Sequence, residues 1–381
     1  MRIYYTLTTI DPIIVSQNNA TTNNHECLDY IPGSTILGAL AAQYYPQFSA
    51  EQSWSAFHSG QVQFSPCYPL VNNEIAFPTP ASWNYDKISG NRIIEEDKYN
   101  TSLLTNHSAS SFIRDENIQY KQCRTGFVNS QGDIAKVQMG HSTKTALDEK
   151  TGSAKESKLF SYSFIESNQT FSGWIELKDN DKEIENAIKC FLNSYIRIGR
   201  SRNTEFGRVK LTEVKVQQPD NNENNDHELV LWCLSDCEFI NNAGLPTLSP
   251  SGENIHPALE KAKLSRDKSF IRSVKTSHFN QKRQGLDTEQ ILIAKGSVLT
   301  YQLDSPLTQS DLHEINTCST GINQQFGLGW MSVNPTWSLN DTISNASIFQ
   351  GSAIQKVDVP TNKFSGADSV LVKWLSSQVS Q

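Results

Sequence analysis

Two stretches of the chain repeat one arrangement: a helical pattern, then a glycine, then a Phe-Gly pair and a strand pattern. In YIRIGRSRNTEFGRVKL (residues 195–211) the first glycine is Gly199, and in GINQQFGLGWMSV (residues 321–333) it is Gly321. Each stretch lies near the end of one half of the chain. Because a repeated order of elements indicates an internal duplication, we expect two halves of similar topology.

The order of the remaining patterns supports this expectation. Residues 2–7 alternate like a half-buried strand, residues 36–44 carry one helical stripe, and 159–177 reads as two strands joined by a turn. A second helical stripe follows at 184–195, with Gly199 suited to its C-terminal cap. We therefore predict an α+β fold with two ferredoxin-like, RRM-related βαββαβ domains in tandem and a long insertion in the first.

Polarity indicates the domain boundaries. The first domain is predicted at 1–216, and the second, more diverged one at 228–335; the linker between them, 217–227, has no apolar residue. Residues 336–381 form a C-terminal extension. Residues 84–157 are polar and poor in periodic apolar positions, so we interpret them as an insertion or mobile arm.

Composition limits the class of protein. A chain of 381 residues is long enough for two domains. Its seven cysteines are odd in number and include no CxxC pair, which predicts neither a disulfide framework nor a zinc site. There is no secretory leader pattern and no apolar run of membrane-spanning length, so we expect a cytoplasmic protein with no membrane contact, cofactor or metal.

The net charge of −7 argues against a protein covered by nucleic acid, but two segments reverse the sign. Residues 197–210 carry a net charge of +4, and residues 263–283 carry +6. Because salt screens charges beyond about 8–10 Å, such local patches decide binding. The sequence therefore predicts local RNA binding.

The first basic segment has the chemistry of a phosphate cradle. Glycine lacks the Cβ that would block a close backbone approach, and the arginine fork matches phosphate oxygens. The alternative is a helix cap with solvated arginines. The predicted RNA-binding residues are Arg197, Gly199, Arg200, Ser201, Arg202, Asn203, Gly207 and Arg208, together with Lys275 and Arg283 from the second basic segment.

Catalytic readings are weaker. His141 could be the general acid or base of a metal-independent ribonuclease, or a loop histidine bonded to its own turn. Asp29 could assist cleavage with a metal, or cap a turn. His25 and His58 are further histidines to test. Motifs for nucleotide hydrolysis, zinc proteolysis and serine hydrolysis are absent from the sequence.

Four segments together resemble one family: LDYIPGSTILGALAAQYY, FHSGQVQFSPCYPL, HSTKTALDEKTGSAKESKLFSYSFIESNQTFSGWIEL and IRIGRSRNTEFGRVKL. They are similar, in order over residues 1–216, to RAMP proteins of type III-D CRISPR effector complexes, specifically the large subunit of the Cas-five group (Csx-ten type). In the second half only GSVLTYQL and FGLGWMSV resemble the pattern.

The resemblance implies a non-catalytic subunit that holds the 5′ repeat-derived tag of the guide RNA in antiviral defence. Its implied partners are the polymerase-like signalling subunit beside it, the RAMP backbone subunits and a family-specific small subunit. The segment 84–140 would be an arm that grips or separates tag nucleotides.

The family's glycine loop maps onto Gly199, Arg200, Ser201, Arg202, Phe206, Gly207 and Arg208, and its second-half counterpart onto Phe326, Gly327, Gly329 and Trp330. Because this counterpart carries no cation, its contact would be backbone or stacking by Trp330.

Three alternatives remain open. An endoribonuclease that processes the guide precursor would depend on a histidine such as His141. A target-slicing backbone subunit would depend on Asp29 and a divalent metal. A protein-only scaffold would use the basic patches to bind acidic partners.

Overall fold

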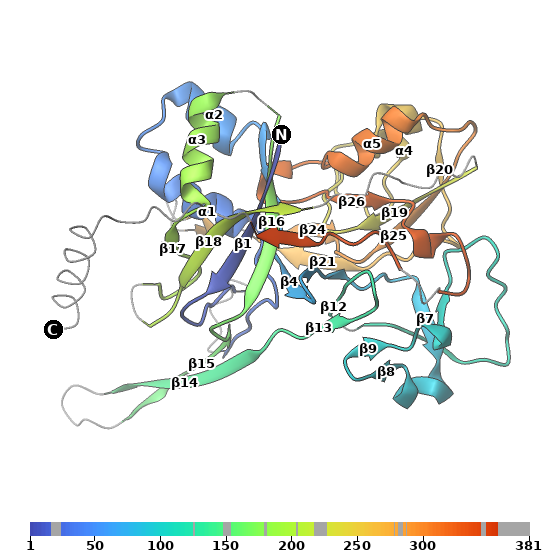
Figure 1. Cartoon of the computed structure of the whole chain (residues 1–381), viewed down its shortest axis with the longest axis horizontal. Coiled ribbons are helices and arrows are strands. Elements are labelled where there is room, and N and C mark those ends of the chain that lie inside the picture. Colours follow the sequence, from blue (N-terminus) through green and yellow to red (C-terminus); the bar gives the residue numbers. More distant parts are fainter. Residues whose placement is uncertain are drawn as a thin grey trace.

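The computed structural model of the chain describes residues 1–16, 24–124, 126–147, 154–178, 181–202, 205–216, 227–277, 279–280, 285–286, 288–343 and 348–356. They form a mixed α/β structure built mainly from antiparallel sheets (Figure 1), which confirms the predicted class at that level. Within these ranges, no helix combines the length and the apolar composition needed to cross a membrane.

The first half is built on one large sheet. Its principal elements, in chain order, are β1 (Arg2–Thr9), α1 (Gly33–Tyr44), α2 (Ala50–Phe57), β3 (Val62–Phe64), β4 (Tyr68–Val71), β16 (Thr170–Leu177), α3 (Lys182–Phe191), β17 (Tyr195–Arg197) and β18 (Arg208–Val216). In the sheet, β1 lies between β18 and β16, and β16 also pairs with β3 and β4. The predicted alternation in β1 is confirmed, because Ile3, Tyr5 and Leu7 are buried in one cluster with apolar residues of α1 and α3.

The second half contains a smaller sheet with the same relative strand order. Its elements are β19 (Glu228–Cys233), α4 (Gly252–Ile255), β20 (Lys263–Leu264), β25 (Val298–Gln302), α5 (Gln309–Thr317) and β26 (Met331–Val333). Here β19 lies between β26 and β25, and β25 also pairs with β20. In each sheet the first core strand therefore lies between the third and the last. Between β20 and β25 the chain forms β21 (Ser273–Thr276), β22 (Phe279–Asn280), β23 (Gly285–Leu286) and β24 (Gln290–Ile293).

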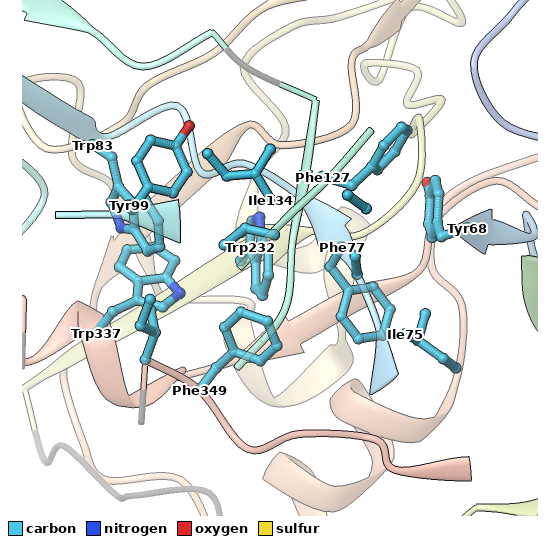
Figure 2. Packing of buried hydrophobic residues seen from close by; sticks show 14 of the residues in the cluster. Tyr68, Ile75, Phe77, Trp83, Tyr99, Phe127, Ile134, Trp232, Trp337 and Phe349 are labelled. Carbon is cyan, nitrogen blue, oxygen red and sulfur yellow. The ribbon is translucent and has the colours of Figure 1, made fainter. Parts of the chain in front are cut away.

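The segment interpreted as an arm is largely packed into the body. It contains the short strands β8 (Ile94–Glu95), β9 (Lys98–Tyr99), β10 (Leu104–Asn106), β11 (Tyr120–Gln122), β12 (Phe127–Val128) and β13 (Ile134–Ala135). β7 (Trp83–Asp86) begins one residue before it, and β5 (Glu74–Ile75) and β6 (Phe77–Pro78) precede it. Figure 2 shows its aromatic residues Tyr99 and Phe127, together with Trp83 just before it, in one cluster with residues of the second half and the C-terminal region, namely Trp232, Trp337 and Phe349. The arm interpretation of 84–140 is therefore wrong for most of its length, because these large side chains are buried between the halves.

A hairpin at the end of the predicted insertion is the part that projects. β14 (Met139–Leu147) pairs antiparallel with β15 (Ala154–Ile165), and the two strands extend away from the sheets (Figure 1). β2 (Asn24–His25) pairs with β15. The projecting element thus begins where the predicted arm was expected to end.

One arginine links the two halves. The Arg2 guanidinium lies 5.2 Å from the ring centroids of both Trp174 and Trp330. It also donates to the Thr317 carbonyl at 2.5 Å, and its Nε bonds Glu176 Oε2 at 2.7 Å. Because Trp174 lies on β16 and Trp330 precedes β26, this stack holds the first sheet against the second half.

The predicted C-terminal extension returns to the first sheet. β27 (Ile354–Lys356) pairs with β18, so the chain crosses back after β26. The predicted linker lies outside the described residues apart from His227, and so do residues 357–381.

Candidate nucleic-acid interface

An open cleft with a volume of about 1470 Å³ lies between the two halves. One wall consists of residues 14–16, the face of α1 and the arginine turn, by which we mean residues 197–208. Residues 272, 274–277, 294–295 and 326–328 contribute from the second half. The sequence stretches singled out for RNA binding in the two halves therefore meet at one site.

The cleft is strongly basic although the chain is acidic. Among the described residues, seven arginine and lysine side chains line it, against the two carboxylates of Asp29 and Asp236. The basic residues are Arg124, Arg197, Arg200, Arg202, Arg272, Lys275 and Lys295. A groove lined by one sign of charge concentrates ligands of the opposite sign, so this cleft favours a polyanion.

The glycines of the arginine turn serve close packing of the chain on itself. Gly199 has φ +79°, and a Cβ there would lie 2.4 Å from the Ile14 carbonyl oxygen. Next to it, Arg200 N donates to the same oxygen at 2.9 Å, and Gly207 N donates to Pro12 O at 2.9 Å. These two N–H groups have partners within the chain, and the lack of a Cβ at Gly199 is what lets the turn pack against Ile14.

The turn also differs from the predicted helix cap. Helix α3 ends at Phe191, where Ser194 Oγ donates to the Phe191 carbonyl at 2.7 Å. The strand β17 follows and pairs with β18, Tyr195 opposite Lys210. The prediction that Gly199 caps the helix is therefore wrong, and the arginine turn connects two antiparallel strands.

The arginines of the turn have different tasks. Arg197 Nη1 donates to the carbonyls of Arg202 at 2.6 Å and Phe206 at 3.3 Å, which fixes the turn from within. Arg208 forms an ion pair with Asp11 at 3.1 Å and does not line the cleft. Arg200 and Arg202 line it, as does Arg197. Three of the four arginines predicted to bind phosphate therefore line the cleft.

Two predicted contact residues are buried. Trp330 is 1% exposed and packs edge-on against Trp174, with ring centroids 5.2 Å apart. Phe206 is 4% exposed and contacts Phe164 at 5.5 Å. The predicted stacking of RNA on Trp330 is therefore wrong for this conformation, because neither face of the indole is open.

The second glycine turn, residues 321–330, is also held by close backbone contacts. Gly327 and Gly329 have φ +88° and +86°, and a Cβ on them would lie 2.4 Å from Phe64 O and 1.9 Å from Thr320 O. Phe326 and Gly327 line the cleft, whereas Gly329 and Trp330 do not.

The other predicted residues divide between surface and cleft. Lys275 lines the cleft and forms an ion pair with Glu289 at 2.9 Å. Ser201 is exposed on the turn with φ +54°. Asn203 and Arg283 lie outside the described residues.

Sequence reasoning missed three basic residues of the cleft: Arg124, Arg272 and Lys295. Burial, and then the charge of Arg124, lower the pKa of Arg272. Arg272 also donates to the Cys123 carbonyl at 2.8 Å, and Lys295 Nζ lies 4.0 Å from the centre of the Tyr30 ring. Arg272 belongs to the +6 segment, which was a usable signal, but Arg124 and Lys295 are isolated cations. An anion bound between Arg124 and Arg272 would relieve the repulsion between these like charges.

Helix α1 begins at the cleft wall. Pro32, Gly33, Ser34 and Thr35 all line the cleft, and the first turn of α1 has neither an acidic residue nor a side-chain cap. The positive end of a helix dipole attracts anions. The start of α1 therefore adds to the basic character of the arginines.

The candidate catalytic residues do not converge. Asp29 and His58 line the cleft, but His141 lies exposed on β14 and not in the loop that was expected. His25 lies on β2. In the ranges that the structure describes, no three His, Cys, Asp or Glu side chains are grouped so as to hold a metal ion.

One family model matches this chain, and several solved structures contain chains that are similar to it. Residues 6–210, more than half of the chain, match the RAMP superfamily. Two solved structures of a type III-B Cmr-beta complex bound to cognate target RNA, one of them also with AMPPnP, contain similar chains. The one with AMPPnP is 13% identical, with a TM-score of 0.45, and the match covers 78% of this chain and 86% of that one. The other is 14% identical, with a TM-score of 0.45 and coverages of 83% and 90%.

A chain of the Csm3-Csm4 subcomplex of the type III-A CRISPR-Cas interference complex is 11% identical, with a TM-score of 0.38, covering 80% of this chain and 98% of that one. A search of curated protein sequences gives no match. The family match extends from β1 through α1 to the arginine turn and the start of β18, so it includes the first wall of the cleft. This chain belongs to the RAMP superfamily.

Proposed function

We propose that this chain is a non-catalytic subunit of a type III-D CRISPR effector, of the Cas-five group (Csx-ten type), and that it binds guide RNA in the basic cleft. It would hold the 5′ repeat-derived tag and cap the complex in the cytoplasm during antiviral defence. Its neighbours would be the polymerase-like signalling subunit, RAMP backbone subunits and a small subunit. The two sheets with equal strand order would be two ferredoxin-like domains.

The charge of the cleft is the observation that carries this proposal. Seven cations face two carboxylates in a chain whose net charge is −7. Phosphate contacts supply the sequence-independent part of nucleic-acid affinity. A concentration of cations that opposes the overall charge of the protein is therefore the expected signature of an RNA backbone site.

The shape of the cleft favours a strand over a compact anion. Its wall follows α1 from Gly33 to Tyr45, a length of about 18 Å at 1.5 Å per residue. Cations are supplied from both halves, by Arg200 and Arg202 on one side and by Arg272 and Lys295 on the other. The phosphates of an extended strand can pair with the cations of both walls at once, whereas a small anion pairs with those of one wall.

The test is to replace Arg200 and Arg202 together by alanine. Guide RNA retained by the purified complex should fall, and the salt dependence of RNA binding should lose about two units of slope because about two phosphate contacts are removed. The matched control replaces Arg92 and Arg266, two exposed arginines outside the cleft, by alanine. Unchanged RNA content in the Arg200/Arg202 variant, measured by the absorbance ratio at 260 and 280 nm, would refute the proposal.

The non-catalytic part of the proposal has its own test. Labelled repeat RNA and labelled target RNA are each incubated with the protein or its complex, with EDTA and with Mg²⁺. We expect both RNAs to stay intact apart from cuts made by partner subunits. Cleavage that disappears in His141→Ala would assign a processing nuclease, and slicing that disappears in Asp29→Asn would assign a target nuclease.

A further inference from the structure

The face of the first sheet that points away from α1 and α3 is covered at one end only. Trp174 and Val214 on this face are buried in the cluster that includes Trp330 and Val230 of the second half. Further along the same strand, Arg208 and Lys210 share the side of Val214 because side chains alternate along β18, and both are exposed. The second half therefore leaves the end of the sheet next to the arginine turn open.

This open end carries one aromatic ring among cations. Strand pairing places Tyr195 opposite Lys210 and Arg197 opposite Arg208, with all four side chains exposed. We call these four residues the Tyr195 face. Tyr195 is 65% exposed, and Lys210 Nζ lies 5.8 Å from the centre of its ring. The β18 register with β1 adds Thr8 beside Lys210, so the neighbouring surface is polar.

Local structure explains why the tyrosine is exposed. β17 is the edge strand of the sheet, and of its three residues Ile196 packs against the apolar cluster on the helix side. Alternation then directs Tyr195 and Arg197 to the opposite side. The Tyr195 ring makes little apolar contact on that side, so the alternation of side chains along β17, and not packing in the core, determines where it lies.

The Tyr195 face is continuous with the cleft. Arg197 belongs to both, since it lines the cleft and lies beside Tyr195 on β17. Its guanidinium is held by the carbonyls of Arg202 and Phe206, so the boundary between the two surfaces is fixed. A strand that leaves the cleft past Arg197 meets Tyr195 next.

We propose that the Tyr195 face binds an unpaired nucleotide of the RNA strand that leaves the cleft. The base stacks on Tyr195, and a flanking phosphate contacts Lys210. Base–aromatic stacking next to a backbone-tracking basic groove is how single strands are held without sequence readout. This inference rests on the proposed function and extends it by naming a second subsite and the path of the strand.

The charges on this face favour RNA over a protein partner. Three of its four residues are cationic, and the ion pair of Arg208 with Asp11 leaves Arg197 and Lys210 in excess. Among the described residues of this half Trp54 is exposed as well, but it lies on α2, which carries Glu51 and no basic residue. That surface has no comparable preference for phosphate.

The experiment measures fluorescence anisotropy of labelled single-stranded oligouridine with the full-length chain. Tyr195→Leu keeps an apolar side chain of similar size but removes the flat ring, and Tyr195→Phe keeps the ring. With an oligonucleotide of about 16 nucleotides we expect Tyr195→Leu to weaken binding about 5- to 100-fold and Tyr195→Phe to change it less than about twofold. With an oligonucleotide too short to extend beyond the cleft, both variants should bind like the wild type.

A scan of single abasic sites along the longer RNA locates the stacked base. One abasic position should weaken binding to the wild type but have no further effect in Tyr195→Leu, since the same contact is already lost. Wild-type affinity of Tyr195→Leu for the long RNA overturns the inference, and so does a loss confined to assembly with a protein partner. A wild-type chain that retains no RNA refutes the proposed function, whereas sensitivity to Arg200/Arg202 without sensitivity to Tyr195 refutes only this subsite.

Discussion

The two glycine turns use the same backbone device in opposite surroundings. In the arginine turn, Gly199 presses against the Ile14 carbonyl, and in the second glycine turn, Gly329 presses against that of Thr320. Both glycines have positive φ. Both turns reach the cleft, but the first brings Arg200 and Arg202 to it, whereas the second contributes residues 326–328 and places Trp330 in the aromatic core between the halves.

This difference shows that a glycine pattern predicts the geometry of a turn but not its ligand. In both turns a side chain at the glycine would collide with the chain's own backbone, so the glycine is needed before any ligand binds. What distinguishes them is the side chains: Arg200 and Arg202 in one, Leu328 and Trp330 in the other. Substitutions of the arginine side chains in the first turn should therefore change RNA affinity, and substitution of Trp330 in the second should change the free energy of unfolding.

Replacement of Trp330 by alanine should have the largest effect. The indole is 1% exposed and contacts both Trp174 and Arg2, so we expect a loss of about 3–5 kcal/mol in the free energy of unfolding. Urea denaturation followed by circular dichroism measures this loss. Trp330→Phe is the milder variant, because it keeps a ring and removes an indole N–H that has no hydrogen-bond partner among the described residues.

The same variants test the role assigned to this turn. If Trp330 stacked on RNA, Trp330→Phe would lower RNA affinity at temperatures where the protein is fully folded. We expect affinity within about twofold of the wild type, because the cleft cations are untouched. A clear loss of affinity without loss of stability would remove the distinction between the two turns.

Alanine at Gly329 or Gly199 should lower stability by about 2–4 kcal/mol, because each combines positive φ with a backbone collision. Gly244→Ala is the matched control: its φ is +76° but no atom lies within 4 Å of the added Cβ, so it should cost only about 1 kcal/mol. Thermal unfolding measures all three. A Gly199→Ala protein with wild-type stability but weaker RNA binding would show that this glycine serves the ligand and not the fold.

Local patterns made several features of this molecule predictable. The alternation of Ile3, Tyr5 and Leu7 identified β1, and helical spacing identified α3 through Ile184 and Ile188. The concentration of cations in the arginine turn was also predictable, because its density of charge is a local property of the sequence. In each case the residues that carry the signal are neighbours along the chain.

Features that depend on distant contacts were not predictable in the same way. Tyr99, Leu104 and Phe127 are spaced without period because they project from short strands of different sheets, so their segment looked like an arm. Arg124 and Lys295 are single cations until the fold places them across from the arginine turn. The burial of Trp330 likewise follows from its contact with Trp174 of the other half and not from its own turn.

The aromatic region between the halves should respond to acid through His107. Burial, and then the charge of Arg114, lower the pKa of His107 to about 4. Its ring stacks on Phe112 at 3.9 Å and approaches Phe270 of the second half at 6.2 Å. In the unfolded chain His107 binds a proton near pH 6.5, and in the folded chain only near pH 4. The contribution of neutral His107 to the free energy of unfolding is therefore complete above pH 6.5 and is lost as the pH falls toward 4.

We expect about 2 kcal/mol of the free energy of unfolding to be lost across this window, after a discount for water access to the ring. Urea denaturation at pH 7, 5.5 and 4 measures it, and His107→Gln should be less stable at pH 7 but flatter with pH. An equal slope in both proteins would show that other groups govern acid sensitivity.

Removal of Asp11 should have the smallest effect on stability and yet change binding. Asp11 Oδ1 forms an ion pair with Arg208 Nη2 at 3.1 Å, and the Arg208 side chain is 51% exposed. Exposed ion pairs contribute about 0–1 kcal/mol, so Asp11→Asn should lower the melting temperature by only a few degrees. The freed arginine adds one cation beside the arginine turn, and RNA affinity should rise about two- to fivefold, with a steeper dependence on salt.

Glu289→Gln, which frees Lys275 in the same way on the opposite wall, should give a rise of similar size if RNA contacts both walls. A rise with Asp11→Asn alone would confine the RNA to the arginine turn and its neighbouring strands.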